Sequence, residues 1–186
     1  MEIQIVILMG VAGVGKTTIG HCLARKLGWP LLEADRFHRP EHIAKMRAGI
    51  PLTDEDRRPW LRALRATIET QLKTGHCAVL ACSALKEDYR SKLVRPGEPI
   101  ALVYLRAPAT LLRQRLTERV GHYMKQSMLE SQLQNLEPPK GLEKGRFATF
   151  LELEAAGPPK KLVAEILRKL GSCNALEDDS FGRDEV

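Results

Sequence analysis

The amino-acid sequence predicts a single α/β domain built around a parallel sheet. Short apolar runs alternate along the chain with segments of helical periodicity, and the first apolar run leads directly into a glycine-rich turn followed by a helix. This alternation is typical of a parallel sheet that carries helices on both faces. The 186 residues suffice for one domain with a buried core, which we assign to residues 1–170.

Each element is predicted from its own residues. Strands are expected at the short apolar runs, which are residues 3–9, 31–32, 77–82, 100–105 and 147–153. Helices are expected between and after them, at residues 16–27, 40–50, 59–74, 83–93, 108–119, 127–136 and 162–170. Three residues are predicted to set boundaries: Gly28 as a C-terminal cap, Pro59 in a first helical turn and Ser83 as an N-terminal cap.

Composition and charge narrow the possible functions. The net charge is +6, yet residues 171–186 are acidic, and we expect them to form a disordered tail. The arginines gather at 57–65 and 106–119 without a polybasic run, which argues against nucleic-acid binding. No apolar run reaches the roughly 20 residues of a membrane span, and no signal peptide is evident. The four cysteines form no C-x-x-C pair, so we expect a reducing, cytoplasmic setting without a metal centre built on them.

A phosphate-binding loop is the strongest motif. Residues 10–17 match G-x-x-x-x-G-K-[ST] at every fixed position, directly after a predicted strand and at the start of a helix. Backbone N–H groups of such a loop cradle phosphates, and the lysine reaches the β- and γ-phosphates. Lys16 is therefore a catalytic candidate, and Thr17 is a candidate ligand for Mg²⁺. The predicted ATP-binding residues are Gly10, Val11, Ala12, Gly13, Val14, Gly15, Lys16, Thr17 and Thr18.

The rest of the chain favours a small-molecule kinase among the proteins that carry this loop. The chain has no N-K-x-D motif for reading guanine and is too short for the extra modules of a motor protein. Glu33 and Asp35 follow the second strand, at the edge of a parallel sheet where ligands bind. Asp35 is the better candidate for the base that orients and deprotonates an acceptor hydroxyl, and either carboxylate could hold Mg²⁺ through water.

Several segments resemble the gluconokinase family, whose relatives include shikimate kinase. They are LMGVAGVGKTT (8–18), EADRFH (33–38), KMRAGIPLTDEDRRPWL (45–61), CSALKEDYR (82–90), RLTERVGH (115–122) and QLQNLEPP (132–139). The resemblance implies a P-loop fold with five parallel strands in the order 2-3-1-4-5. It also implies ATP-dependent phosphorylation of D-gluconate to 6-phosphogluconate, which feeds the pentose phosphate pathway, and a homodimer is typical of the family. One departure is Glu33, where the family commonly has Asp.

A sugar-acid acceptor would need a cation for its carboxylate and polar groups for its hydroxyls. Arg57 is our first candidate for the carboxylate, followed by Lys86 and Arg90, since an arginine can hold a carboxylate with two hydrogen bonds. His38 and His122 are candidates for contacts with the acceptor, and Gln132, on the helix expected to pack against the lid, is a weaker candidate.

A lid is expected at about residues 119–127. Arg115 and Arg119 lie four residues apart on one helix face. Arg119 is the candidate for stabilising charge during transfer, and Arg115 is the candidate for support of the nucleotide. Two alternatives remain open: a kinase of the same fold for another small acceptor, such as shikimate or a nucleotide, and a non-catalytic ATP-binding regulator.

Overall fold

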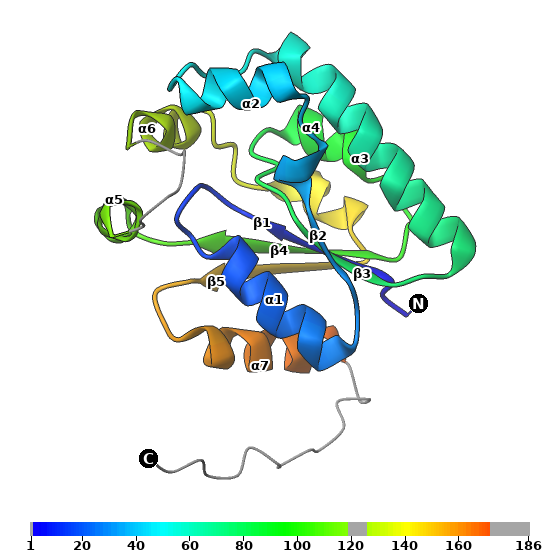
Figure 1. The fold of residues 1–186 in the computed structure, drawn as a ribbon. Coiled ribbons are helices and arrows are strands. Elements are labelled where there is room, and N and C mark those ends of the chain that lie inside the picture. The colour runs from blue at the N-terminus through cyan, green and yellow to red at the C-terminus, as the bar shows by residue number, and fades with distance from the viewer. Residues whose placement is uncertain (1, 119–125, 172–186) are drawn as a thin grey trace, which may run out of the picture.

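The sheet has five parallel strands in the order β2-β3-β1-β4-β5. A computed structural model describes residues 2–118 and 126–171 (Figure 1). The strands are β1 (Ile5–Met9), β2 (Leu31–Glu33), β3 (Ala78–Ala81), β4 (Ile100–Arg106) and β5 (Thr149–Glu154). This architecture confirms the predicted parallel sheet and its strand order.

Helices cover both faces of the sheet. In Figure 1, α1 (Lys16–Leu27) and α7 (Pro159–Leu170) lie on one face, and α3 (Asp54–Thr74) and α4 (Glu87–Leu93) lie on the other. The remaining helices, α2 (Pro40–Arg47), α5 (Ala109–Thr117) and α6 (Gln126–Gln134), lie toward the edge of the sheet where the P-loop is. Two short 3₁₀ helices, η1 (Ala34–Phe37) and η2 (Gly141–Arg146), complete the described elements.

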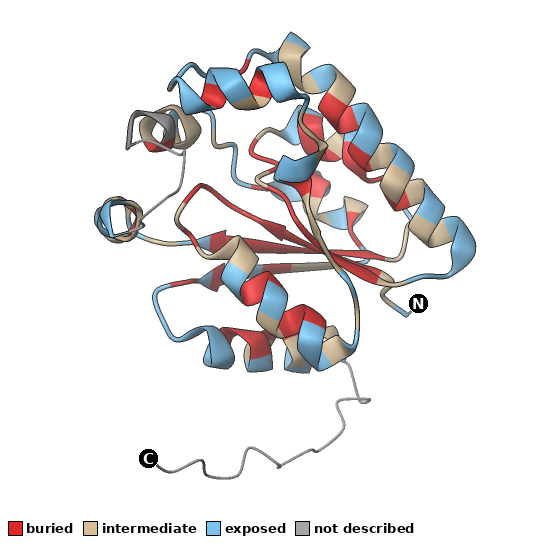
Figure 2. Ribbon diagram, viewed as in Figure 1, coloured by how far each residue is buried: buried red, intermediate tan, exposed pale blue. Residues whose placement is uncertain are grey.

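The core lies on both sides of the sheet, as strand alternation requires. In β1, Val6 and Leu8 pack with α1 and α7, while Ile5, Ile7 and Met9 pack with α3 and α4. Figure 2 shows that the central strands β1, β3 and β4 are almost entirely buried. Since the strands are held rigidly on both sides, the loops at their carboxyl ends have a fixed platform for a ligand site.

Some predicted boundaries are wrong. Helix α3 begins at Asp54, because Thr53 forms a reciprocal capping box with Asp56, and Pro59 lies inside the helix instead of opening it. Helix α4 begins only at Glu87, so Ser83 does not cap it. Gly28 does cap α1 in the left-handed conformation, with φ 67°.

No helix within residues 2–118 and 126–171 is both long and apolar enough to span a membrane.

Candidate active site

The P-loop joins β1 to α1 in the conformation its motif predicts. Gly10 has φ 144°, and a Cβ added there would lie 2.5 Å from the carbonyl oxygen of Leu105 in β4, so only glycine fits. Gly13 has φ 80°, again in the region that favours glycine. Val11 and Val14 are buried and anchor the loop in the core. The loop is thus held against the sheet while its backbone turns around an open cavity.

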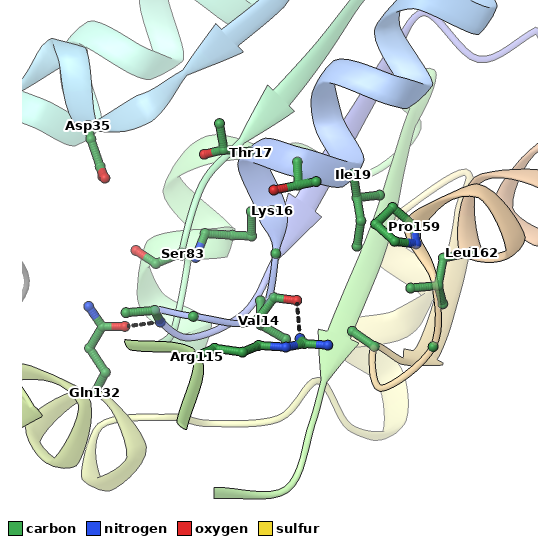
Figure 3. Close-up of a pocket in the computed structure, with 16 residues that line it drawn as sticks. Val14, Lys16, Thr17, Ile19, Asp35, Ser83, Arg115, Gln132, Pro159 and Leu162 are labelled. Carbon is green, nitrogen blue, oxygen red and sulfur yellow. Dashed lines mark hydrogen bonds between the residues drawn. The ribbon is translucent and has the colours of Figure 1, made fainter. Parts of the chain in front are cut away.

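Two cationic side chains, Lys16 and Arg115, donate hydrogen bonds to carbonyl groups of this loop. The Lys16 ammonium donates hydrogen bonds to the carbonyl oxygens of Gly10 (2.8 Å) and Val11 (3.0 Å). Arg115, from α5, donates to the carbonyl of Val14 at 3.4 Å and lines the cavity (Figure 3). Positive charge therefore surrounds the place where the loop would cradle phosphates.

The cavity over the P-loop is large enough for a nucleotide to enter. It encloses about 350 Å³ and is lined by loop residues together with the start of α1. Its opposite wall is apolar and comes from the connection between β5 and α7, with Ala155 and Gly157, and from the start of α7, with Pro159 and Leu162. In Figure 3, Pro159 and Leu162 lie on one side of the loop, while Asp35, Ser83 and Gln132 lie on the other. The apolar side suits a purine ring and the polar side suits the reacting phosphate.

A second, narrower cleft opens beside the first. It encloses about 50 Å³ and is lined from several elements by Asp35, His38, Met46, Pro51, Leu52, Arg57, Trp60, Ser83, Leu85, Tyr89, Ser131, Gln132 and Asn135. Three of these residues, Asp35, Ser83 and Gln132, also line the nucleotide cavity. The two spaces therefore meet at these three side chains, and a group bound in one lies next to a group bound in the other.

His38 lies in the second cleft as a neutral ring. Its imidazole stacks on Trp60, with ring centroids 4.8 Å apart and an interplanar angle of 5°. Burial lowers the pKa of His38 from 6.5 to about 4, although nearby Asp35 opposes the shift. Its buried Nδ1 atom has no hydrogen-bond partner among residues 2–118 and 126–171. A neutral imidazole held in this way can exchange hydrogen bonds with a hydroxyl group.

Arg57 also lines the cleft, where it meets Tyr89. Its guanidinium donates to the Leu52 carbonyl and, at 3.4 Å, to the Tyr89 hydroxyl, and it lies 5.7 Å from the Tyr89 ring centroid. The Tyr89 hydroxyl in turn donates to Asp54, and hydrogen bonds from Tyr89 and Lys86 lower the pKa of Asp54. Lys86 is bound to Asp54 at 2.9 Å and is not among the lining residues of the cleft. Arg57 is therefore better placed than Lys86 to meet an acceptor carboxylate.

The structure does not place Arg90 at the site. Its side chain is 1% exposed, and its guanidinium pairs with the buried Glu143. It also donates to the carbonyls of Ala84 (2.9 Å) and Leu85 (3.0 Å). The prediction that Arg90 contacts a ligand is therefore corrected: its donors hold together the turn before α4 and the η2 segment.

The two carboxylates at the carboxyl end of β2, Glu33 in the strand and Asp35 just after it, differ in their placement. Asp35 lines both the cavity and the cleft, whereas Glu33 lines neither and pairs with Arg36 at 3.1 Å. Among the described residues, no group of three His, Cys, Asp or Glu side chains is arranged to hold a metal ion. Mg²⁺ in kinases is bound by one or two protein oxygens with phosphate and water. The Thr17 hydroxyl and the Asp35 carboxylate on the cavity wall fit that requirement.

Some predicted site residues cannot be placed, and others were missed. Arg119, His122 and most of the lid predicted at about 119–127 lie outside the described residues, as does the acidic tail from residue 172 onward. Sequence reasoning missed Ser83 and Tyr89 as lining residues, although both belong to the CSALKEDYR segment. It also missed the apolar wall after β5, whose only signal was the Gly-Pro-Pro turn at 157–159.

The fold and the site together define a class. A P-loop on a parallel sheet, a nucleotide-sized cavity and an adjoining cleft that carries polar side chains are the parts of a P-loop kinase that phosphorylates a small molecule.

Comparison with known proteins gives the family. The family described as AAA domain matches residues 5–139. Gluconokinase from Gluconobacter oxydans (strain 621H) is 46% identical over 165 residues, which cover 89% of this chain and 90% of that protein. The crystal structure of a gluconokinase from Sinorhizobium meliloti 1021 is 38% identical, has a TM-score of 0.76, and matches 92% of this chain and 94% of its own.

A sugar kinase from Janibacter sp. HTCC2649, solved unliganded, is 42% identical with a TM-score of 0.82, covering 91% of this chain and 95% of its own. The chain belongs to the gluconokinase family, which confirms the resemblance seen in the sequence.

Proposed function

We propose that this protein transfers the γ-phosphoryl group of ATP to D-gluconate, giving 6-phosphogluconate and ADP. The observation that carries the proposal is that Asp35, Ser83 and Gln132 line both the nucleotide cavity and the second cleft. Phosphoryl transfer needs the donor phosphate and the acceptor hydroxyl to lie in line and within reach, and a shared boundary provides this. Membership of the gluconokinase family supports gluconate as the acceptor.

The nucleotide would bind with its phosphates in the P-loop and its base against the apolar wall near Pro159 and Leu162. Lys16 would neutralise charge on the β- and γ-phosphates, and Arg115 would support the phosphates from the side of α5. Thr17, with Asp35 through water, would hold the Mg²⁺ that accompanies ATP, which supplies further neutralisation of phosphate charge.

The acceptor would occupy the second cleft, whose walls must move apart to admit it. Arg57 would bind the gluconate carboxylate, because its guanidinium already lies on the cleft wall beside Tyr89. His38 would bind a hydroxyl group of the sugar chain. Asp35, at the junction of the two spaces, would orient the reacting hydroxyl and accept its proton.

A panel of acceptors tests the proposal. Purified protein is given ATP and Mg²⁺ with D-gluconate, shikimate, nucleoside monophosphates or no acceptor, and ADP release is followed. We expect D-gluconate to give the highest kcat/KM. A higher value for another acceptor would refute gluconate as the substrate, and the absence of turnover with every acceptor would favour an ATP-binding regulator.

A pair of neighbouring arginines tests the assignment of the carboxylate site. Losing a hydrogen bond to a charged group removes roughly 1.5–3 kcal/mol, so Arg57→Ala should raise the KM for gluconate by about 10- to 150-fold and leave the KM for ATP nearly unchanged. Arg58→Ala is the control, because Arg58 is exposed and pairs with Glu55 at 3.2 Å. Equal effects of the two substitutions would overturn the role of Arg57.

A further inference from the structure

Gln132 connects the P-loop to a distant part of the chain. Its Oε1 atom accepts a hydrogen bond of 2.7 Å from the backbone N–H of Ala12, 120 residues earlier in the sequence (Figure 3). Ala12 is a P-loop residue, and Gln132 lies on α6. The N–H groups of such a loop are the ones that meet phosphate. A side chain bonded to one of them is therefore within reach of the bound phosphates.

The same contact fixes the orientation of the Gln132 carboxamide. A backbone N–H can only donate, so the carbonyl end of the carboxamide must face Ala12 and the NH₂ end must face away from it. Gln132 lines both the nucleotide cavity and the second cleft. In Figure 3 its NH₂ end points toward the side of the cavity where Asp35 and Ser83 lie. The donor end is thus directed at the boundary that the phosphoryl group must cross.

We propose that Gln132 binds the γ-phosphate directly. Its Oε1 atom continues to accept the hydrogen bond from the Ala12 N–H, while its Nε2 atom donates a hydrogen bond to a γ-phosphoryl oxygen. A neutral donor in this position orients the phosphoryl group between Lys16 on one side and the acceptor on the other. ADP has no γ-phosphate and cannot make this contact. The inference rests on the proposed function for the identity of the nucleotide, and it is independent of which acceptor is used.

The substitution Gln132→Glu tests the donor end of the carboxamide separately from its acceptor end. Gln132→Glu keeps an acceptor for the Ala12 N–H and keeps the size of the side chain, but it replaces the donor with a second carboxylate oxygen. That oxygen would repel the γ-phosphate. Gln134→Glu is a matched control, because Gln134 lies two residues further along the same helix, is exposed, and undergoes the same change of charge.

The test measures the dissociation constants of ADP and of the β,γ-imido analogue of ATP by calorimetry, with Mg²⁺ and without acceptor. In Gln132→Glu we expect affinity for the ATP analogue to fall by about 10- to 100-fold, and affinity for ADP to change less than about threefold, because one charge-assisted contact becomes a repulsion. Gln134→Glu should leave both constants unchanged. Gln132→Ala removes both the acceptor and the donor of the carboxamide, and it should also lower the affinity for the ATP analogue more than the affinity for ADP.

Two results would overturn the inference. An equal loss of affinity for ADP and for the ATP analogue would show that Gln132 only stabilises the conformation of the P-loop. Tighter binding of the analogue by Gln132→Ala would show that Gln132 competes with phosphate for the Ala12 N–H. Because no acceptor is present, either result leaves the choice of gluconate as substrate untouched, and that choice fails only in the acceptor panel.

Discussion

Replacing Arg90 with methionine tests whether this arginine holds the fold or binds a ligand. Its side chain is 1% exposed and that of its partner Glu143 is 4% exposed, so the pair is shielded from water. Arg90→Met keeps an unbranched side chain of similar length and removes the charge. It leaves the Glu143 carboxylate buried without a counter-ion and takes a donor away from the carbonyls of Ala84 and Leu85.

The expected cost is large. Breaking a buried ion pair by removing one partner destabilises a protein by about 3–5 kcal/mol. For a domain of this size each kcal/mol lowers Tm by roughly 2–4 °C, so the variant should melt about 6–20 °C below the parent. Removing both charges with Arg90→Met and Glu143→Leu should restore much of the loss, because no unpaired charge remains. Arg106→Met is the control. Arg106 is 56% exposed in its pair with Glu152, so this substitution should lower the stability by less than about 1 kcal/mol.

The assay is urea unfolding followed by circular dichroism, together with gluconate kinetics at a temperature where the variant is folded. We expect a lower unfolding midpoint with an unchanged slope, and a KM for gluconate within about threefold of the parent. A variant that keeps its stability but has a KM raised more than about tenfold would refute the structural role and restore Arg90 as a ligand-binding residue.

Two further predictions concern catalysis at the site, and a third concerns the pH dependence of stability. Lys16→Ala should fold normally and lose activity by at least about 10²- to 10³-fold, because one transition-state contact is lost; kcat within tenfold of the parent would contradict this. Asp35→Asn should bind both substrates while kcat falls by about 10²- to 10⁴-fold, and full recovery of kcat at high Mg²⁺ would leave Asp35 with its metal role alone and exclude it as the base.

The folded-state pKa of His38, about 4, lies below its ordinary value of 6.5, so stability is complete above pH 6.5 and falls as pH drops toward 4. The full shift corresponds to about 3 kcal/mol, which solvent screening of the half-buried ring reduces to about 1–2 kcal/mol. His38→Gln should lose less stability than the parent between pH 7 and 4.5 in urea unfolding. Equal losses in the two proteins would contradict burial of the His38 ring as the cause of the pH dependence.

The sequence predicted those parts of the molecule in which local pattern and chemistry coincide. The P-loop is contiguous, so its spacing alone defines a strand, a turn and a helix, and the buried strands are plain apolar runs. The placement of Arg90 could not be predicted, because an arginine near a family motif suggests a ligand until its partner Glu143, 53 residues away, is known. The stacking of His38 on Trp60 and the contact of Gln132 with Ala12 likewise depend on tertiary packing between distant segments.

The predicted start of helix α3 was wrong for a local reason. Pro59 is common at a first helical turn, but the capping box at Thr53 is a stronger start signal, because it satisfies two backbone donors and places acidic residues at the positive end of the helix. With the start moved to Asp54, the side chain of Arg57 lies in the first turn of α3, beside the cleft. The correct boundary therefore matters for the proposed acceptor site.

The most direct test of the central claim is the identity of the product. Purified protein is incubated with ATP, Mg²⁺ and D-gluconate, and the mixture is followed by ³¹P NMR. We predict that the γ-phosphate signal of ATP disappears as ADP and one phosphomonoester signal appear in equal amounts, with coupling to the protons on carbon 6 of gluconate. Release of inorganic phosphate alone, or no loss of ATP at saturating gluconate, would contradict the assignment of this site to gluconate phosphorylation.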